Sequence, residues 1–380
     1  MKNILLSLLF ISITHASETP NDLIKGVEFV MQHMPAQDKG TIDETRITQD
    51  VKLALKVKET YPWAQNTPWE VYQNDVLPYA VVNEDRCDWR QQFLEKFAPH
   101  VADCKTGTEA TLKIASIIGD ILKVGYSVQR NKPHQGVDES LKSGKVSCTG
   151  QSILLVCALR SIGIPARMAG ILSWNHIRGN HSWVEAWCDG EWQMIEYNEK
   201  NFNTPWVMHN LTMIDETKPM NNVIATSWSK NSQEPELFFP MIWEAKVNTK
   251  TSSIVFPQEA RSVPGINVTK RYGKLAKAWY EQQADKTPGS ELLIELTELK
   301  DNQTHRIEAK ATLSDEQGKT IAEGTTPSST ADMRQFLILK LPQDVQTATL
   351  TITHPESDQT FTQTVKHTQA PLQIIRAQMR

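Results

Sequence analysis

The segment from Ser147 to Asn198 constrains the fold of this chain more than any other stretch. It begins SCTGQSILLVCALRSIGIPAR, where small oxygen-bearing residues flank Cys148 and an apolar run follows. The apolar positions cover most of a helical surface, which is typical of a buried helix. Gly163 suits the left-handed residue that ends a helix, and Pro165 prevents its continuation. The pattern therefore predicts a buried helix with a cysteine in its first turn.

The first turn of a helix is a chemically special place for Cys148. Unpaired backbone N–H groups and the positive end of the helix dipole favour a thiolate there. The same N–H groups can hold the oxyanion of a tetrahedral intermediate. The simpler interpretation is that Cys148 is a small hydrophobic residue before a buried helix. For a single cysteine this simpler interpretation is the better one, unless a base lies nearby in the fold.

A candidate base opens the second half of the segment. The run HSWVEAWC from His181 alternates between two faces and predicts a strand. The Asp-Gly pair after it is a two-residue hairpin signal, and the chain then returns as a partner strand. On that partner strand, Glu196 is placed to accept a hydrogen bond from the imidazole and fix its tautomer. The alternatives are a satisfied core histidine at 181 and a solvated carboxylate at 196.

The combined pattern resembles the transglutaminase-like branch of the papain-type cysteine enzymes. The resemblance rests on C-x-G-x-S, LR-x-IGIPAR and HSWVEAW-x-DG-x-W, and it covers roughly residues 108–207. It implies an α+β fold in which the helix carrying Cys148 packs on an antiparallel sheet carrying His181. By the same resemblance Cys148 is the nucleophile and His181 the base. The stretch LPYAVVNEDRCDWR, residues 77–90, suggests the helical lead-in of a bacterial subset of this group.

The third position of the triad departs from the family pattern. The resemblance implies an acidic orienting residue there, usually Asp, and the aligned residue in this chain is Glu196. This departure leaves Asn198 and Glu199 as alternative orienting groups. It also leaves open a protein that has kept the fold and lost turnover.

Three further residues are candidates for substrate binding. Gln135 lies in a polar loop before the cysteine helix and has an amide that can donate to an oxyanion. Five of the 11 tryptophans lie between Trp174 and Trp206, and we expect Trp174 and Trp183 to line a trough for the substrate. The alternatives are a solvated loop residue at 135 and core packing for the tryptophans.

The first 16 residues predict export. Lys2 is followed by a short apolar run and by Thr14-His15-Ala16, which has the small residues that a signal peptidase reads. The run is too short to span a bilayer, and no later stretch is long and apolar enough, so membrane insertion is not expected. The net charge of −4 gives no electrostatic footprint for nucleic acid. We therefore expect a periplasmic or secreted protein.

Export also bears on the five cysteines. With Cys148 set aside as the nucleophile, Cys87 and Cys104 flank a short helical segment, and we predict a disulfide between them. A zinc site built from His176, His181 and Cys188 does not match known ligand spacings. We expect neither a metal nor a cofactor.

The composition changes along the chain and predicts five parts. Beyond Gly289 apolar residues recur at every second position, although Leu293 and Ile338 break the alternation. Short strands with no helical pattern between them predict a small β-sandwich, with a role as a binding or spacer module. The parts are a signal peptide at 1–16, a helical N-terminal region at 17–105, a transglutaminase-like core at 106–255, a linker and short helix at 256–288, and the sandwich at 289–380.

The expected function is an exported cysteine-dependent amide hydrolase or acyl transferase. Its substrate would be a peptide or protein, including peptides of a cell wall. Hydrolysis, as in a protease or amidase, is favoured over cross-linking because water needs no second substrate site. The alternative is a catalytically inactive peptide- or glycan-binding protein on the same fold.

Overall fold

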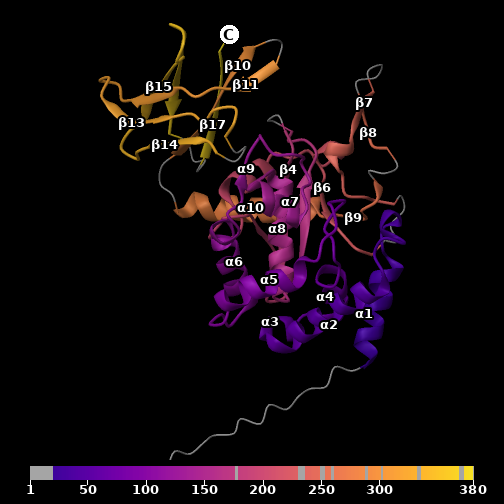
Figure 1. The fold of residues 1–380 in the computed structure, drawn as a ribbon. Coiled ribbons are helices and arrows are strands. Elements are labelled where there is room, and N and C mark those ends of the chain that lie inside the picture. The colour runs from indigo at the N-terminus through magenta and orange to yellow at the C-terminus, as the bar shows by residue number, and fades with distance from the viewer. Residues whose placement is uncertain are drawn as a thin grey trace, which may run out of the picture.

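A computed structural model describes residues 20–175, 179–229, 236–248, 253–257, 261–286, 290–300, 303–331, 335–367 and 372–379. The predicted signal peptide and His176 lie outside these residues. The chain combines helices with antiparallel sheets, has a helical N-terminal part and ends in a strand-rich part (Figure 1). The predicted α+β fold class is therefore confirmed. None of the described helices is long and apolar enough to cross a membrane.

The N-terminal part consists of helices that share one core with the middle of the chain. Each presents apolar residues to that core, as Val51 and Phe93 do with no exposed surface. Asp43 caps one helix by accepting a hydrogen bond from the Arg46 amide at 2.8 Å. The helices are α1 (Pro20–Gln32), α2 (Glu44–Thr60), α3 (Pro62–Gln65), α4 (Trp69–Asp75) and α5 (Trp89–Phe97).

The middle of the chain is a five-stranded antiparallel sheet between helices. Its strand order is β5-β4-β3-β6-β9, with β4 paired to β5 on one side and to β3 on the other. The strands are β3 (Ala166–Ile171), β4 (His181–Cys188), β5 (Glu191–Ile195), β6 (Val223–Thr226) and β9 (Gly265–Asn267). The helices are α6 (Gly107–Leu122), α7 (Val137–Ser143), α8 (Cys148–Ser161), α9 (Pro205–Leu211) and α10 (Thr269–Lys286).

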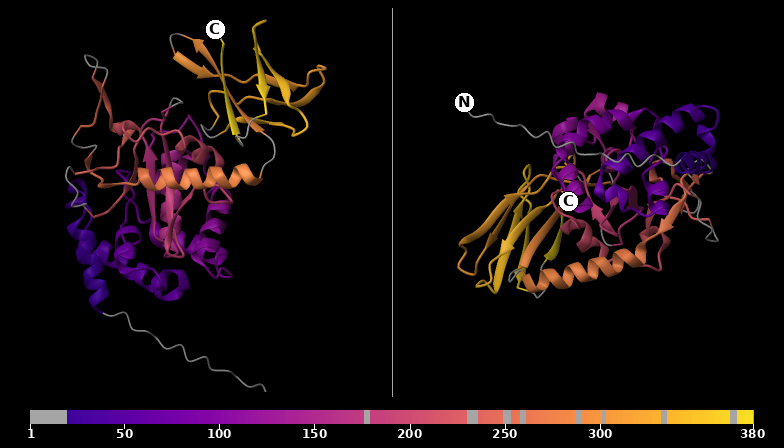
Figure 2. Two further views of the ribbon diagram at one scale, coloured as in Figure 1. Left: turned by 180° about the vertical axis from the view of Figure 1, so that it is seen from behind. Right: turned by 90° about the horizontal axis from the view of Figure 1, so that it is seen from below.

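Both faces of this sheet are covered. Val184 and Ala186 of β4 join the core that contains α8, while Trp183 faces a second core with α9 and α10. Figure 1 shows α8 on the near face of the sheet, and the view from behind in Figure 2 shows α10 crossing the far face. The alternation predicted for β4 thus sorts its side chains into two different apolar cores.

The predicted helix end and hairpin are confirmed. Gly163 has φ +76° just beyond the end of α8, where a left-handed residue is needed. Asp189 and Gly190 have φ +54° and +97°, and they join β4 to β5 with Cys188 opposite Glu191. Both features follow from local backbone preferences, which explains why the sequence alone predicts them.

Residues 262–273 fall in the part expected as a linker and short helix, 256–288. They contain β9, which pairs with β6, and the first turns of α10. A Cβ on Gly265 would lie 2.6 Å from a side-chain carbon of Ile224 and 2.8 Å from the backbone of Phe238. The glycine therefore marks a close approach of backbones within a sheet rather than a flexible joint.

The C-terminal strands form a sandwich of two four-stranded sheets. One sheet contains β10 (Ser290–Lys300), β11 (Gln303–Arg306), β14 (Leu337–Leu341) and β17 (Leu372–Met379). The other contains β12 (Lys310–Ser314), β13 (Thr320–Thr325), β15 (Thr347–Thr353) and β16 (Thr360–Lys366). Residues from both sheets, including Leu292 and Leu350, meet in one buried cluster. This cluster is the predicted sandwich core.

The two residues that break the alternation mark the outer face of the first sheet. Leu293 is the cross-strand neighbour of Ile338 on β14 and of Ile374 on β17. Leu293 is only 3% exposed and, with Ile374, packs in the core that contains α9 and α10. The sandwich is therefore docked on the middle of the chain through apolar residues on its outer face.

The predicted Cys87–Cys104 disulfide is wrong. Both residues are free thiols. The short helical segment expected between them is α5. Cys87 lies beside the backbone of Asp138, whereas Cys104 lies near Glu109, so the two thiols have different neighbours.

Candidate active site

Ser147 fixes the start of α8, where Cys148 is the first helical residue. The Ser147 hydroxyl oxygen accepts a hydrogen bond from the Gly150 amide at 3.1 Å, as a helix cap does. A Cβ on Gly150 would lie 2.8 Å from a side-chain carbon of Val146, so only glycine lets the preceding strand approach this turn. Cys148 itself is half-buried. The thiol is thus held at the helix end where N–H groups point outward.

His181 begins β4 and is 1% exposed. Its Nε2 atom lies 2.7 Å from Oε1 of Glu196. Nδ1 has no hydrogen-bond partner among the described residues, and the Cys148 side chain interacts with the imidazole. The imidazole therefore lies beside both a carboxylate and a thiol, which is the composition of an oriented base beside a candidate nucleophile.

The neighbours of His181 decide its charge. Burial alone would lower the pKa of the imidazole, because it disfavours the charged form. The hydrogen bonds to Cys148 and to the Glu196 carboxylate outweigh burial and raise the pKa of His181 to about 9. The imidazolium form is therefore favoured at neutral pH, next to the thiol.

Glu196 stands at the third position of the predicted triad and is 4% exposed. While its Oε1 atom faces His181, its Oε2 atom accepts a hydrogen bond from the Thr204 hydroxyl. The alternative residue Asn198 points elsewhere, because its Oδ1 atom accepts from the Gly119 amide of α6 at 2.9 Å. Of the alternatives considered from the sequence, Glu196 is the residue that the fold brings to the imidazole.

The tryptophans around the site are mostly packed rather than open. Trp174 is 3% and Trp183 is 1% exposed, and their rings stack with centroids 6.3 Å apart. Trp206 of α9 is 9% exposed, and its ring meets His181 edge-on at 5.1 Å between centroids. Trp183 also lies beside the imidazole, with ring centroids 5.9 Å apart, and Trp174 packs on Trp183 and Trp206. The expected trough residues Trp174 and Trp183 are thus buried in aromatic packing next to His181.

Gln135 is fully buried and does not present its amide to a substrate. Its Nε2 atom donates to the Ser143 hydroxyl at 2.9 Å, which ties the loop before α7 to the end of that helix. The predicted oxyanion donor therefore has a structural partner. The remaining candidates for this role are the backbone N–H groups of the first turn of α8.

A buried ionic cluster fixes the strand that carries His181. Glu185 of β4 has no exposed surface and lies between two arginines: Arg167 of β3, at 2.7 Å, and Arg271 of α10. These guanidinium groups hold the pKa of the Glu185 carboxyl below its usual range, although burial opposes them. The next residue of α10, Tyr272, accepts a hydrogen bond from Trp183 Nε1 at 2.6 Å. Helix α10 thus fixes the strand that carries His181.

The other four cysteines are held as neutral thiols. Burial raises the pKa of Cys87 to about 11 and that of Cys188 to about 12. It also raises the pKa of Cys104 and, more strongly, that of the fully buried Cys157. Because the thiolate is the reactive form, none of these four residues competes with Cys148 as a nucleophile at neutral pH.

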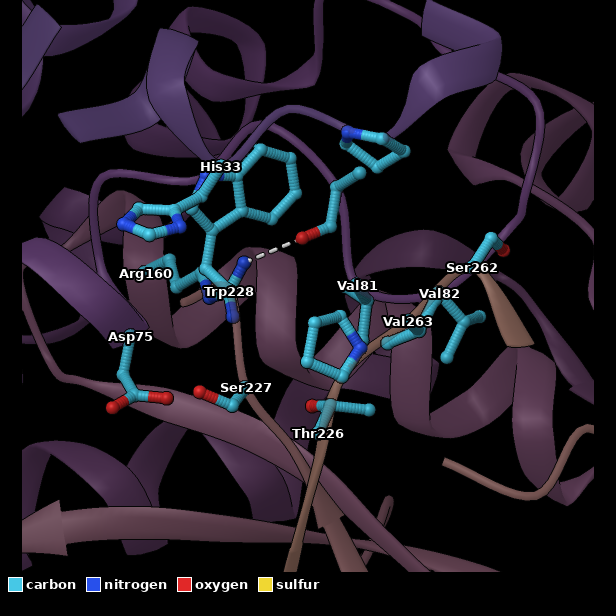
Figure 3. Close-up of a pocket in the computed structure, with 13 residues that line it drawn as sticks. His33, Asp75, Val81, Val82, Arg160, Thr226, Ser227, Trp228, Ser262 and Val263 are labelled. Carbon is cyan, nitrogen blue, oxygen red and sulfur yellow. Dashed lines mark hydrogen bonds between the residues drawn. The ribbon is translucent and has the colours of Figure 1, made fainter. Parts of the chain in front are cut away.

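A small cavity lies beside Asp75 and Arg160 (Figure 3). Its volume is about 10 Å³, room for roughly one water molecule. Arg160 donates to the Ala80 carbonyl at 2.8 Å across its wall, while Oδ1 of Asp75 and the hydroxyl of Ser262 have no hydrogen-bond partner among the described residues. The cavity is too small for a substrate and suits a structural water.

Sequence reasoning missed Thr204 and Trp206. The Thr-Pro pair at 204–205 is a visible signal for a helix start, because proline is favoured in the first turn. The Thr204 hydroxyl does not cap that helix and goes to Glu196 instead. This choice depends on where α9 lies in the fold, which the sequence pattern does not reveal.

One segment of the chain matches a known family. Residues 95–197 match the model of the transglutaminase-like superfamily. A solved structure described as a "putative cysteine protease" from Cytophaga hutchinsonii is similar at 17% identity and a TM-score of 0.25. That similarity covers 29% of this chain and 37% of the other, so the chain spans little more than a third of the length of that structure. No curated protein matches the chain.

Proposed function

We propose, from the membership of residues 95–197 in the transglutaminase-like superfamily, that this chain is a cysteine-dependent amide hydrolase that acts on a peptide or protein. The observation that carries the proposal is the placement of His181 between the Cys148 side chain and the Glu196 carboxylate. A buried imidazole that is hydrogen-bonded to a carboxylate and interacts with a thiol is suited to move a proton at that thiol.

In the first half of the reaction, the Cys148 thiolate attacks the amide carbonyl carbon. The carbonyl electrons move to oxygen, and backbone N–H groups at the start of α8 stabilise the oxyanion. When the intermediate collapses, the C–N bond breaks and His181 gives its proton to the leaving amine. The product is a thioester between Cys148 and the acyl group of the substrate.

In the second half, water replaces the amine. His181 takes a proton from water as the water oxygen attacks the thioester carbonyl, and the C–S bond then breaks. The carboxylic acid leaves, and the thiolate–imidazolium pair is restored. An amine in place of water would give acyl transfer, and hydrolysis is preferred because water needs no second substrate site.

The location of the reaction is part of the proposal. The apolar run after Lys2 and the Thr14-His15-Ala16 site support export, and peptides of the cell envelope are therefore candidate substrates. Mass spectrometry of the protein purified from its native cells tests this point. A mature chain that still carries residues 1–16 would contradict it.

A thiol probe and a substrate assay together test the activity. Limiting iodoacetamide at pH 7, followed by peptide mapping, should label Cys148 at least about tenfold faster than Cys87 and Cys104, which serve as internal controls. Hydrolysis of a mixed peptide library should stop in Cys148→Ala. Adding a fluorescent primary amine separates hydrolysis from transfer. Selective labelling without turnover of any peptide would favour the inactive binding protein instead.

A further inference from the structure

The C-terminal sandwich reaches the candidate active site through one aromatic residue. Phe336, just before β14, stacks on Trp206 with ring centroids 5.8 Å apart and an interplanar angle of 21°. Trp206 in turn meets His181 edge-on at 5.1 Å. Three rings from three separate parts of the sequence thus form a continuous row that ends at the imidazole.

Phe336 is held in place from its own side. The Arg306 guanidinium lies over its ring at 4.9 Å from the centroid, and Arg306 also donates to the carbonyl of the neighbouring Gln335. A cation over an aromatic face is attractive and restricts the ring. Phe336 is half-buried, so part of its ring remains available to a bound molecule.

The contact is anchored by a larger docking surface. Leu293 and Ile374 on the outer face of the sandwich pack in the core formed with α9 and α10, the same core that contains Trp206. A spacer or an independent binding module needs no apolar docking face beside the catalytic histidine. The buried Leu293 therefore indicates that the sandwich is fixed against the site and is not an independently moving module.

We propose that the sandwich completes the active site, with Phe336 and Trp206 forming the wall that accepts an apolar side chain of the substrate next to the scissile amide. This inference rests on the proposed function of Cys148 and His181. The wall presents aromatic surface with the Arg306 cation over Phe336, so it favours aromatic or aliphatic groups over cationic ones. Phe336 is a specificity-determining residue, and it lies outside the matched segment 95–197.

Two alkylating reagents test the wall without a known substrate. Iodoacetamide is small and polar, whereas phenacyl bromide carries a phenyl group beside its reactive carbon. In Phe336→Ala the rate of Cys148 alkylation by phenacyl bromide should fall by about three- to tenfold, as expected for one lost aromatic contact, while the iodoacetamide rate stays unchanged. Phe336→Leu should recover part of the loss. Phe361→Ala, a partly buried phenylalanine in the core of the same sandwich, is the matched control and should leave both rates unchanged.

The outcomes separate this inference from the proposed function. An unchanged ratio of the two rates in Phe336→Ala overturns the wall, and so does an equal fall in both rates, because that result indicates a merely structural role. Failure of iodoacetamide to label Cys148 selectively in the wild type overturns the proposed nucleophile instead. Circular dichroism of each variant checks folding, and the Leu variant keeps the test decisive if the Ala variant unfolds.

Discussion

Thr204 donates its hydroxyl hydrogen bond to the Oε2 atom of Glu196, while the Oε1 atom of the same carboxylate faces His181. The two oxygens are therefore held by two different elements, the start of α9 and the start of β4. A carboxylate bonded at both ends cannot rotate away from the imidazole. This relationship fixes the glutamate carboxylate against the imidazole.

Thr204→Val should weaken this arrangement. The change keeps the shape of the side chain and removes the hydroxyl donor, which leaves one oxygen of a buried carboxylate unpaired. A hydrogen bond to a charged group contributes roughly 1.5–3 kcal/mol, so kcat/KM should fall by about tenfold or more. Thr204→Ser keeps the donor and serves as the control. Equal activity in the Val variant and the wild type would contradict the role assigned to Thr204.

The activity should decline as pH rises through about 9. His181 must carry a proton to protonate the leaving amine, and its raised pKa keeps that proton through neutral pH. Because the pKa of His181 is raised in the folded protein, the imidazole is fully protonated below the ordinary histidine pKa. It loses its proton as pH rises through about 9. A pH profile of kcat/KM measures this alkaline limb. An alkaline limb centred below pH 7 would show that the pKa of His181 is not raised by its neighbours.

Glu196→Gln should move that limb to lower pH and lower the rate strongly. The carboxylate is one of the groups that raise the pKa of His181, and an amide can also favour the wrong tautomer. Glu196→Asp should be milder because the charge remains. Asn198→Ala is the matched control, since Asn198 bonds to Gly119 rather than to the imidazole. An unshifted limb in Glu196→Gln, with a large loss in Asn198→Ala, would reassign the orienting role.

Glu185→Gln should destabilise the protein. The substitution leaves the buried Arg167 without its carboxylate partner, and breaking such a pair costs about 3–5 kcal/mol. Arg271→Ala should cost less, because the Arg271 side chain is 33% exposed and its charge is partly hydrated. Urea unfolding at pH 7 measures both variants. A smaller loss of unfolding free energy for Glu185→Gln than for Arg271→Ala would contradict the role assigned to the ionic cluster around Glu185.

The mature protein should contain no Cys87–Cys104 disulfide. Both residues are free thiols in the folded chain, and they lie beside different neighbours, Asp138 and Glu109. Titration of thiols in denaturant should give five per chain, with or without prior reduction. A count of three without reduction would show that the pair is oxidised. Peptide mapping would then identify the bonded residues.

The features that the sequence predicts are those set by local chemistry. The helix from Cys148, its end near Gly163 and the Asp-Gly hairpin each depend on neighbouring residues only. The features that it does not predict depend on packing between distant segments. Gln135 turns inward because Ser143 offers an acceptor, and β9 joins the sheet because Gly265 permits a close approach. Leu293 is predicted only in part. The sequence shows that it breaks the alternation of its strand, but it does not show the surface against which the side chain packs.

The ionic cluster around Glu185 also has a consequence for the smallest piece of this chain that can fold. The matched segment ends at residue 197 and contains three of the five strands of its sheet. A fragment cut there would leave β3 as an unpaired edge and would lack Arg271 and Tyr272, so Glu185 would lose one of its two cations. We expect an autonomous unit only when α10 is included. During synthesis, the strand that carries His181 would then pack fully only after the chain has grown some 90 residues beyond His181, counting to Arg271 and Tyr272.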